Sequence, residues 1–177
     1  RAAAEVLCER WKAARGSDDG TEPTLIVVDD PYAAQATAEA RLAVETAAKR
    51  LEAAGFAVKR FPVFREIEPI NERHNRMIAR EFAAVHREWV ASYRPLYSER
   101  SLELIRKGEA VNDAELEKAR ASTFELRERL EGILGARDAA VFLSPSAQSA
   151  APEGIEATGS PLLNLPWTHA GLPTVTV

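Results

Sequence analysis

Cysteine is scarce in this chain, and no metal-binding spacing is present. Cys8 is the only cysteine in 177 residues, so no disulfide can form within the chain. No Cys-x-x-Cys pair or closely spaced His/Cys set occurs, which argues against a zinc site. The apolar helical pattern around Cys8 predicts a buried thiol. The lack of a disulfide agrees with a reducing compartment. We therefore expect a cytoplasmic protein with no metal.

An excess of positive charge is also missing. The 23 Lys and Arg residues are outnumbered by 27 Asp and Glu, for a net charge of −4. Nucleic-acid binding requires a basic surface, so we expect no nucleic-acid partner. The longest uncharged stretch, 159–177, contains Pro161, Pro166 and Pro173 and cannot form a spanning helix. We expect no membrane partner either.

The familiar catalytic motifs are absent too. The sequence has no Gly-x-Ser-x-Gly, no Ser-x-x-Lys and no glycine-rich phosphate loop. Ser144, Ser146 and Ser149 follow a predicted strand, but no base can be named for them. His74 and His86 lie 12 residues apart on one predicted helix, about 120° apart around its axis, and cannot share a metal. We assign both histidines to surface or partly buried positions and no residue of this chain to catalysis.

An alternation of strand and helix patterns is present. "TLIVV", residues 24–28, is an apolar β-branched run followed by the Asp29-Asp30-Pro31 turn, and it predicts a buried strand. Residues 38–54 have a helical apolar face that ends at Gly55, and "FAVKRFPV", residues 56–63, alternates as a strand. Strand, helix and strand in this order predict a parallel βαβ unit.

Helices dominate the middle of the chain. Apolar spacing predicts helices over 2–14, 69–93 and 112–134, and a shorter one from residue 98 that stops at Gly108. Asn112 and Glu115 have the spacing of a capping box. Further strands are predicted in "DAAVFLSP", 138–145, and from Thr174 onward. These patterns predict an α/β fold with a mixed sheet flanked by helices. Both ends look cut, so we interpret residues 1–177 as a single incomplete domain.

The closing segment, 139–177, has the composition of a pocket wall. It is largely uncharged and combines one indole, Trp167, with the amide of Asn164 and several hydroxyl groups. His169 is a further candidate for ligand contact. The alternative is a buried connection between strands with a packed tryptophan, and composition alone leaves the two even.

The same segment resembles the C-terminal part of the amidase signature family. Such proteins show an apolar strand ending in a small hydroxyl residue and Pro, then Ala-Pro-x-Gly, Thr-Gly, an Asn, a Pro-Trp-Thr cluster and Gly-Leu-Pro. "HNRMIAREFAA", "YSERSLELIRKGEAV" and "AAKRLEAAGFAVKRFPVF" are similar to earlier parts of the family, so the resemblance runs from about residue 24 to the end. The matching positions are Asp138, Ser144-Pro145, Ala151-Pro152, Gly154, Thr158-Gly159, Asn164, Trp167-Thr168 and Gly171-Leu172-Pro173.

The resemblance implies a fold, a reaction and a division of labour. It implies the amidase signature fold and hydrolysis of a small-molecule amide to an acid and an amine or ammonia, without an organic cofactor. The Ser-cisSer-Lys triad would lie before Arg1, in the remainder of the amidase domain, and nothing in this chain matches it. This chain would supply scaffold and pocket wall, with Thr158, Asn164, Trp167 and His169 as substrate-binding candidates, and would be inactive alone. Ser160 stands where relatives often carry an acid.

Two other functions remain open from the residues themselves. A helical scaffold module would pair the apolar seam of 112–134 with another chain, for instance in a homodimer that Leu126→Glu would disrupt. A ligand-binding α/β domain would instead place Asp29-Asp30 at its pocket, and converting both residues to Asn would abolish binding.

Overall fold

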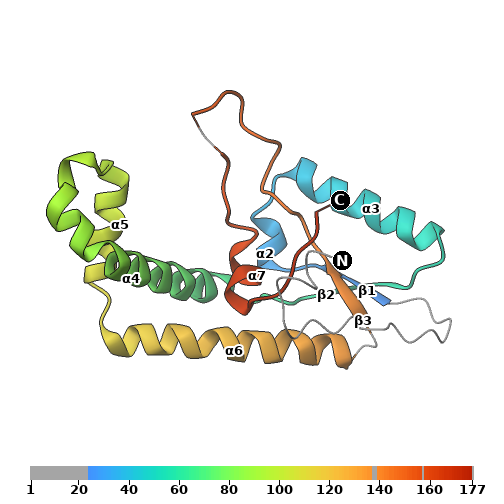
Figure 1. Cartoon of the computed structure of the whole chain (residues 1–177). Helices are drawn as coiled ribbons and strands as arrows, with labels where there is room; N and C mark the ends of the chain where they lie inside the picture. The colour runs from blue at the N-terminus through green and yellow to red at the C-terminus, as the bar shows by residue number, and fades with distance from the viewer. Residues whose placement is uncertain (1–23, 137–138, 157, 177) are drawn as a thin grey trace, which may run out of the picture.

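A computed structural model describes residues 24–136, 139–156 and 158–176 (Figure 1). The predicted helix over 2–14 lies outside the described residues. Along the chain, strands and helices alternate at first, a run of helices follows, and a strand and a short helix come last. The elements are β1 (Thr24–Val28), α2 (Pro31–Ala34), α3 (Ala38–Ala53), β2 (Val58–Phe61), α4 (Ile67–Tyr93), the 3-10 helix η1 (Arg94–Leu96), α5 (Glu99–Glu109), α6 (Asp113–Gly135), β3 (Ala139–Leu143) and α7 (Leu165–Ala170).

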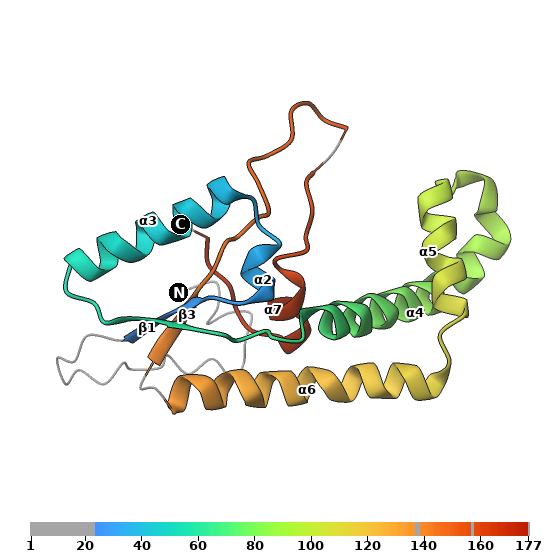
Figure 2. The ribbon, with the colours of Figure 1, turned by 180° about the vertical axis from the view of Figure 1, so that it is seen from behind.

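A three-stranded parallel sheet in the order β2-β1-β3 lies at one end of the molecule. β1 is central and buried from Leu25 onward, because it has a neighbour on each side and helices over its faces. The views from front and back place α3 on one side of the sheet and α6 on the other (Figures 1 and 2). The α/β class predicted from the sequence is confirmed.

The parallel pairing of β1 and β2 confirms the predicted βαβ unit, whereas the antiparallel pairing expected of a mixed sheet is not found among the described residues. Both pairings found in the described part of the chain are parallel, with Leu25 opposite Val58 on one side and Val141 on the other. Residues 174–176, expected to start a strand, belong to none. A β-branched run forms a strand only where a partner offers its backbone groups, and local pattern does not reveal that partner.

Helix boundaries mostly follow the predicted signals. Gly55 follows the end of α3 at φ 99°, in the left-handed region, as predicted. The Thr37 hydroxyl, which the sequence analysis did not single out, accepts from Ala40 N at the start of α3. Asn112 and Glu115 form the predicted capping box at the start of α6. Gly108 is different: it lies inside α5 and does not stop it.

The role of Gly108 is close packing of α5 on α4. A Cβ atom at this position would lie 2.0 Å from the carbonyl oxygen of Ala79. The two helices can therefore approach only because the side chain is a hydrogen atom. The resulting α4–α5 hairpin extends away from the sheet (Figures 1 and 2).

The core joins the sheet to the helices. Ile26 and Val28 of β1 pack with Phe64, Leu130 and Trp167 in one buried cluster. No helix within the described ranges is both long and apolar enough to cross a membrane.

Candidate functional site

Three of the four predicted site residues lie on or next to α7. Asn164 precedes the helix, and Trp167 and His169 belong to it. The helix is short because Pro166 favours its first turn and Gly171, at φ 64°, provides the left-handed residue that ends it. Thr158 lies in the preceding loop and is exposed.

Trp167 is anchored in a cluster of aromatic rings. Its indole is 6% exposed, and the ring centroids of Phe64 and Phe142 lie 4.7 and 5.4 Å away. Its Nε1–H donates to the hydroxyl oxygen of Tyr32 at 2.9 Å, and that hydroxyl donates to the carbonyl of Leu163 at 2.8 Å. The indole therefore has one fixed position, set by a tyrosine 135 residues away in sequence.

Tyr32 is a site residue that sequence reasoning missed. It is fully buried, and burial raises the pKa of its hydroxyl above the usual 10.0, so the group is protonated at neutral pH and can donate. The only sequence signal was its position two residues after Asp30 at a strand end. A hydroxyl that both donates and accepts inside the core can orient the indole and the chain before α7 together.

Asp30 has a structural task in this arrangement. Its carboxylate accepts from the backbone nitrogens of Tyr32, Val63 and Phe64. It thereby caps α2 and ties the segment after β2 to the end of β1. Asp29 is exposed. The Asp29-Asp30 pair is thus used as an Asp-Pro turn, the plainest of the sequence interpretations.

A cavity of about 350 Å³ opens beside Trp167. Asn164 and Trp167 line it together with Ser144 and Ser146, and the Asn164 amide donates to the carbonyl of Ser146 at 3.3 Å. The remaining lining is mainly apolar and includes Phe142. An apolar wall with hydroxyls, an amide and one indole suits a small neutral ligand, which the polar groups would orient.

His169 faces away from this cavity, into the contact between α7, α4 and α6. Its Nε2 lies 2.8 Å from the hydroxyl oxygen of Ser122, and its ring centroid lies 5.5 Å from that of His74. Burial, with smaller effects of His74 and Arg73, lowers the pKa of His169 to about 4. Thr158 and His169 are therefore outside the cavity lining, while Asn164 and Trp167 are in it.

His74 departs from its expected place. The sequence predicted a surface or partly buried side chain, but the imidazole is 2% exposed. The spacing of His74 and His86 along α4 showed only that their side chains point in different directions. It could not predict the contact of His74 with His169, because His169 belongs to α7. Within the ranges that the structure describes, no set of three His, Cys, Asp or Glu side chains could hold a metal ion.

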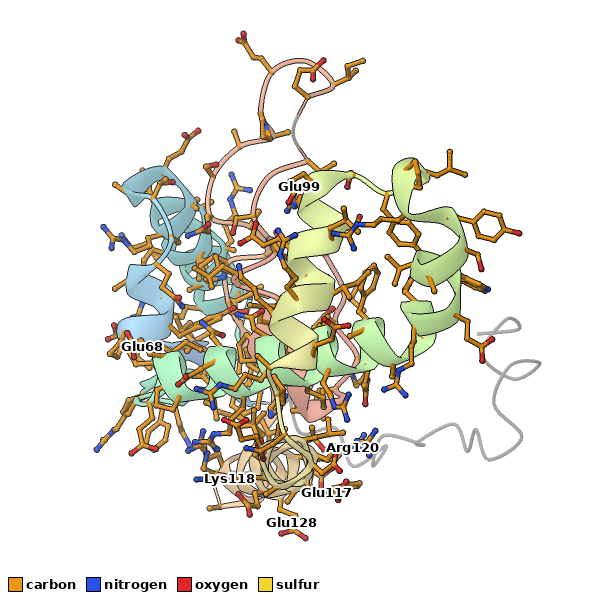
Figure 3. The ribbon with its side chains drawn as sticks, turned by 90° about the vertical axis from the view of Figure 1, so that its left-hand side faces the viewer. Glu68, Glu99, Glu117, Lys118, Arg120 and Glu128 are labelled. Carbon is orange, nitrogen blue, oxygen red and sulfur yellow. The ribbon has the colours of Figure 1, made fainter. Side chains whose placement is uncertain are left out.

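The apolar seam of α6 is covered by the chain itself. Leu126 and Leu130 are buried in the core cluster with Trp167. Figure 3 looks along α6 from one end and shows Glu128 at the edge away from α4. The seam thus packs within the protein and leaves a charged outer face.

Comparison with known proteins points to one architecture. No protein-family model and no curated protein matches the chain. A solved structure described as an amidase matches with a TM-score of 0.73 and 22% sequence identity, over 90% of this chain. The chain has the fold of part of an amidase. It spans 40% of the amidase it matches, so the likeness concerns the architecture of a portion of that protein.

The match covers 90% of the chain, so it takes in most of the elements described above. This likeness in fold agrees with the resemblance seen in the sequence, which was carried by residues 138–173 and the helices before them.

Proposed function

We propose that this chain is the C-terminal part of an amidase that hydrolyses a small carboxylic amide to an acid and an amine or ammonia. Residues 1–177 form an incomplete domain, and the Ser-cisSer-Lys triad lies in a preceding segment. The observation that carries the proposal is the amidase fold over 90% of the chain, combined with the cavity at Asn164 and Trp167.

The residues of this chain bind and orient rather than react. The indole of Trp167 offers a flat apolar wall, and Asn164 offers an amide that can both donate to and accept from a substrate amide. Thr158 belongs to an exposed loop and contributes to binding where that loop meets the rest of the domain. His169 contributes indirectly, through the placement of α7.

The chemistry follows the division of labour implied by the family resemblance. The lysine, acting through the middle serine, removes a proton from the nucleophilic serine, which attacks the amide carbonyl. The amine or ammonia leaves, and water hydrolyses the acyl-enzyme. Backbone N–H groups of the catalytic segment stabilise the oxyanion. No cofactor takes part, and the protein acts in the cytoplasm.

The test compares this chain with the full gene product. Ammonia release from a panel of aliphatic and aryl carboxamides is measured for both, and for full-length Trp167→Phe, Asn164→Ala and Trp89→Phe. We expect no turnover by the chain alone and turnover by the full product. The KM should rise in Trp167→Phe and Asn164→Ala, and it should stay unchanged in Trp89→Phe, whose residue lies far from the cavity.

Two results would overturn the proposal. One is turnover by the chain alone, which would place the catalytic groups here. The other is a full gene product that has no glycine- and serine-rich segment and releases no ammonia from any of the amides.

A further inference from the structure

Two buried histidines and a serine hold α7 against α4 and α6. His169 of α7, His74 of α4 and Ser122 of α6 are each at most 3% exposed. The two imidazole rings meet edge to face at 82°, and the Nε2 of His169 lies 2.8 Å from the Ser122 hydroxyl oxygen. Each of the three helices thus supplies one polar side chain to the same interior contact.

The hydrogen bonds determine which nitrogen of His169 carries its proton. The Ser122 hydroxyl donates its one hydrogen to the carbonyl of Ala119 at 2.7 Å. It can therefore only accept from His169, so Nε2 bears the hydrogen and Nδ1 is the basic nitrogen. Among the described residues, neither this Nδ1 nor Nδ1 of His74 has a hydrogen-bond partner, and both atoms are buried.

A proton added at either Nδ1 atom would create a buried charge with no acceptor. The titratable and charged groups that act on His169 are His74 and Arg73, both from α4. From α6, Arg127 donates to the carbonyl of Gly171, at the end of α7, at 3.1 Å. Arg127 is itself paired with Glu131. Burial is the main opposition to a proton on His169, and Arg73 and a protonated His74 would add repulsion.

We propose that His74, His169 and Ser122 form an acid-sensitive latch that seats α7 and thereby places the Trp167 indole at the cavity. His74 and Ser122 act as positioning residues through His169. With both rings neutral the latch is closed; protonation drives α7 away from α4 and α6 so that the new charge reaches water. The latch concerns the placement of the cavity wall and does not depend on the reaction at that cavity.

The sign of the pH dependence follows from linkage. A solvated histidine takes up a proton near pH 6.5, whereas the pKa of His169 in the closed structure is about 4. Acidification from pH 6.5 towards 4 therefore favours any state in which α7 is released, and the latch is at full strength above pH 6.5.

Trp167 itself can report the release. In the chain with Trp11→Phe and Trp89→Phe, the only remaining indole is that of Trp167. We expect its emission to shift to longer wavelength between pH 6.5 and 4 while the far-ultraviolet circular dichroism is retained. Emission that stays constant to pH 4, or changes in one step with the circular dichroism, overturns the proposal.

Matched glutamine variants separate the latch from general acid effects. In His169→Gln the new side chain can still donate to Ser122 but cannot become charged. This variant should therefore lower the pH midpoint of the emission change by about one unit or more. His74→Gln should lower the midpoint by less. His86→Gln, on α4 beside Tyr97, should leave it unchanged. A midpoint that is the same in all three variants refutes the latch.

A measurement on the unsubstituted chain covers the case in which His169→Gln does not fold. The imidazole proton resonances of His74 and His169 are followed by NMR between pH 7.5 and 4.5, in buffer and in 8 M urea. We expect His169 to stay neutral at pH 5.5 in buffer, His74 to titrate at a lower pH in buffer than in urea, and both rings to titrate near 6.5 in urea. Titration near 6.5 in both conditions contradicts the proposal.

Discussion

The two halves of α4 carry the same apolar stripe but meet different surroundings. Ile67, Ile70 and His74 are buried against the core, whereas Val85 and Trp89, further along the stripe, are exposed in the α4–α5 hairpin. Helical periodicity is continuous across both halves. An apolar stripe thus identifies which face of a helix can be buried. Whether that face is buried depends on which other segments of the chain pack against it.

The two described tryptophans show the contrast most directly. Trp167 is 6% exposed, with its N–H bonded to Tyr32 and three aromatic rings around it. Trp89 is 54% exposed and touches the ring of His86 edge to face. Substitutions at the two positions should therefore differ in their cost by several kcal/mol.

The largest effect is expected at the buried indole. Trp167→Ala would leave a cavity in the core and should lower the free energy of unfolding by about 3–5 kcal/mol. Trp89→Ala should change it by about 0.5 kcal/mol or less. Urea unfolding followed by far-ultraviolet circular dichroism measures both, and equal effects would break the comparison.

The next effect tests the hydrogen bond that fixes the indole. Tyr32→Phe removes one hydroxyl and leaves Trp167 Nε1 and the Leu163 carbonyl without their shared partner, at a cost of about 1–3 kcal/mol. Tyr93→Phe, at the exposed end of α4, is the matched control and should cost nothing measurable. Chemical denaturation curves compare the two; a stable Tyr32→Phe variant would show that ring packing alone holds Trp167.

A similar cost is expected where α5 meets α4. Gly108→Ala would press a methyl group onto the carbonyl of Ala79 and should destabilise by about 1–3 kcal/mol. Gly132→Ala in α6, where no described atom lies within 4 Å of the new Cβ, should stabilise by about 0.5–1 kcal/mol through helix propensity. Thermal melts measure both shifts, and they should have opposite signs.

The smallest effect belongs to the cap at the far end of α6. Asn112→Ala removes the acceptor for Glu115 N and should cost about 1 kcal/mol. Because the first turn of α6 lies far from α7, the emission of Trp167 in the native state should not change. A native-state spectral shift in this variant would mean that the two ends of the helix layer are coupled.

Local signals predicted the elements whose causes are local. The apolar run of β1, the Asn112 cap and the glycine after α3 all act within a few residues, and each was found where the sequence placed it. Of the four substrate-binding candidates, Asn164 and Trp167 line the cavity, and Thr158 and His169 do not.

What the sequence missed depends on contacts between distant segments. Tyr32 and Trp167 are 135 residues apart, and Ser122 and His169 are 47 apart. Gly108 was expected to end a helix, yet its use is a close approach to Ala79 on another helix. No spacing rule within one element records such encounters.

The sequence by itself determined that this protein alternates strand with helix, that α6 has a buried and a charged face, and that a largely uncharged, tryptophan-bearing segment follows β3. Those properties follow from side-chain periodicity and backbone preference, which operate over a few residues. Only the tertiary structure decided that β3 also pairs with β1 in parallel, that Tyr32 orients Trp167 and that two histidines meet beneath α7. Such outcomes depend on which surfaces exclude water together, and that is a property of the folded chain as a whole.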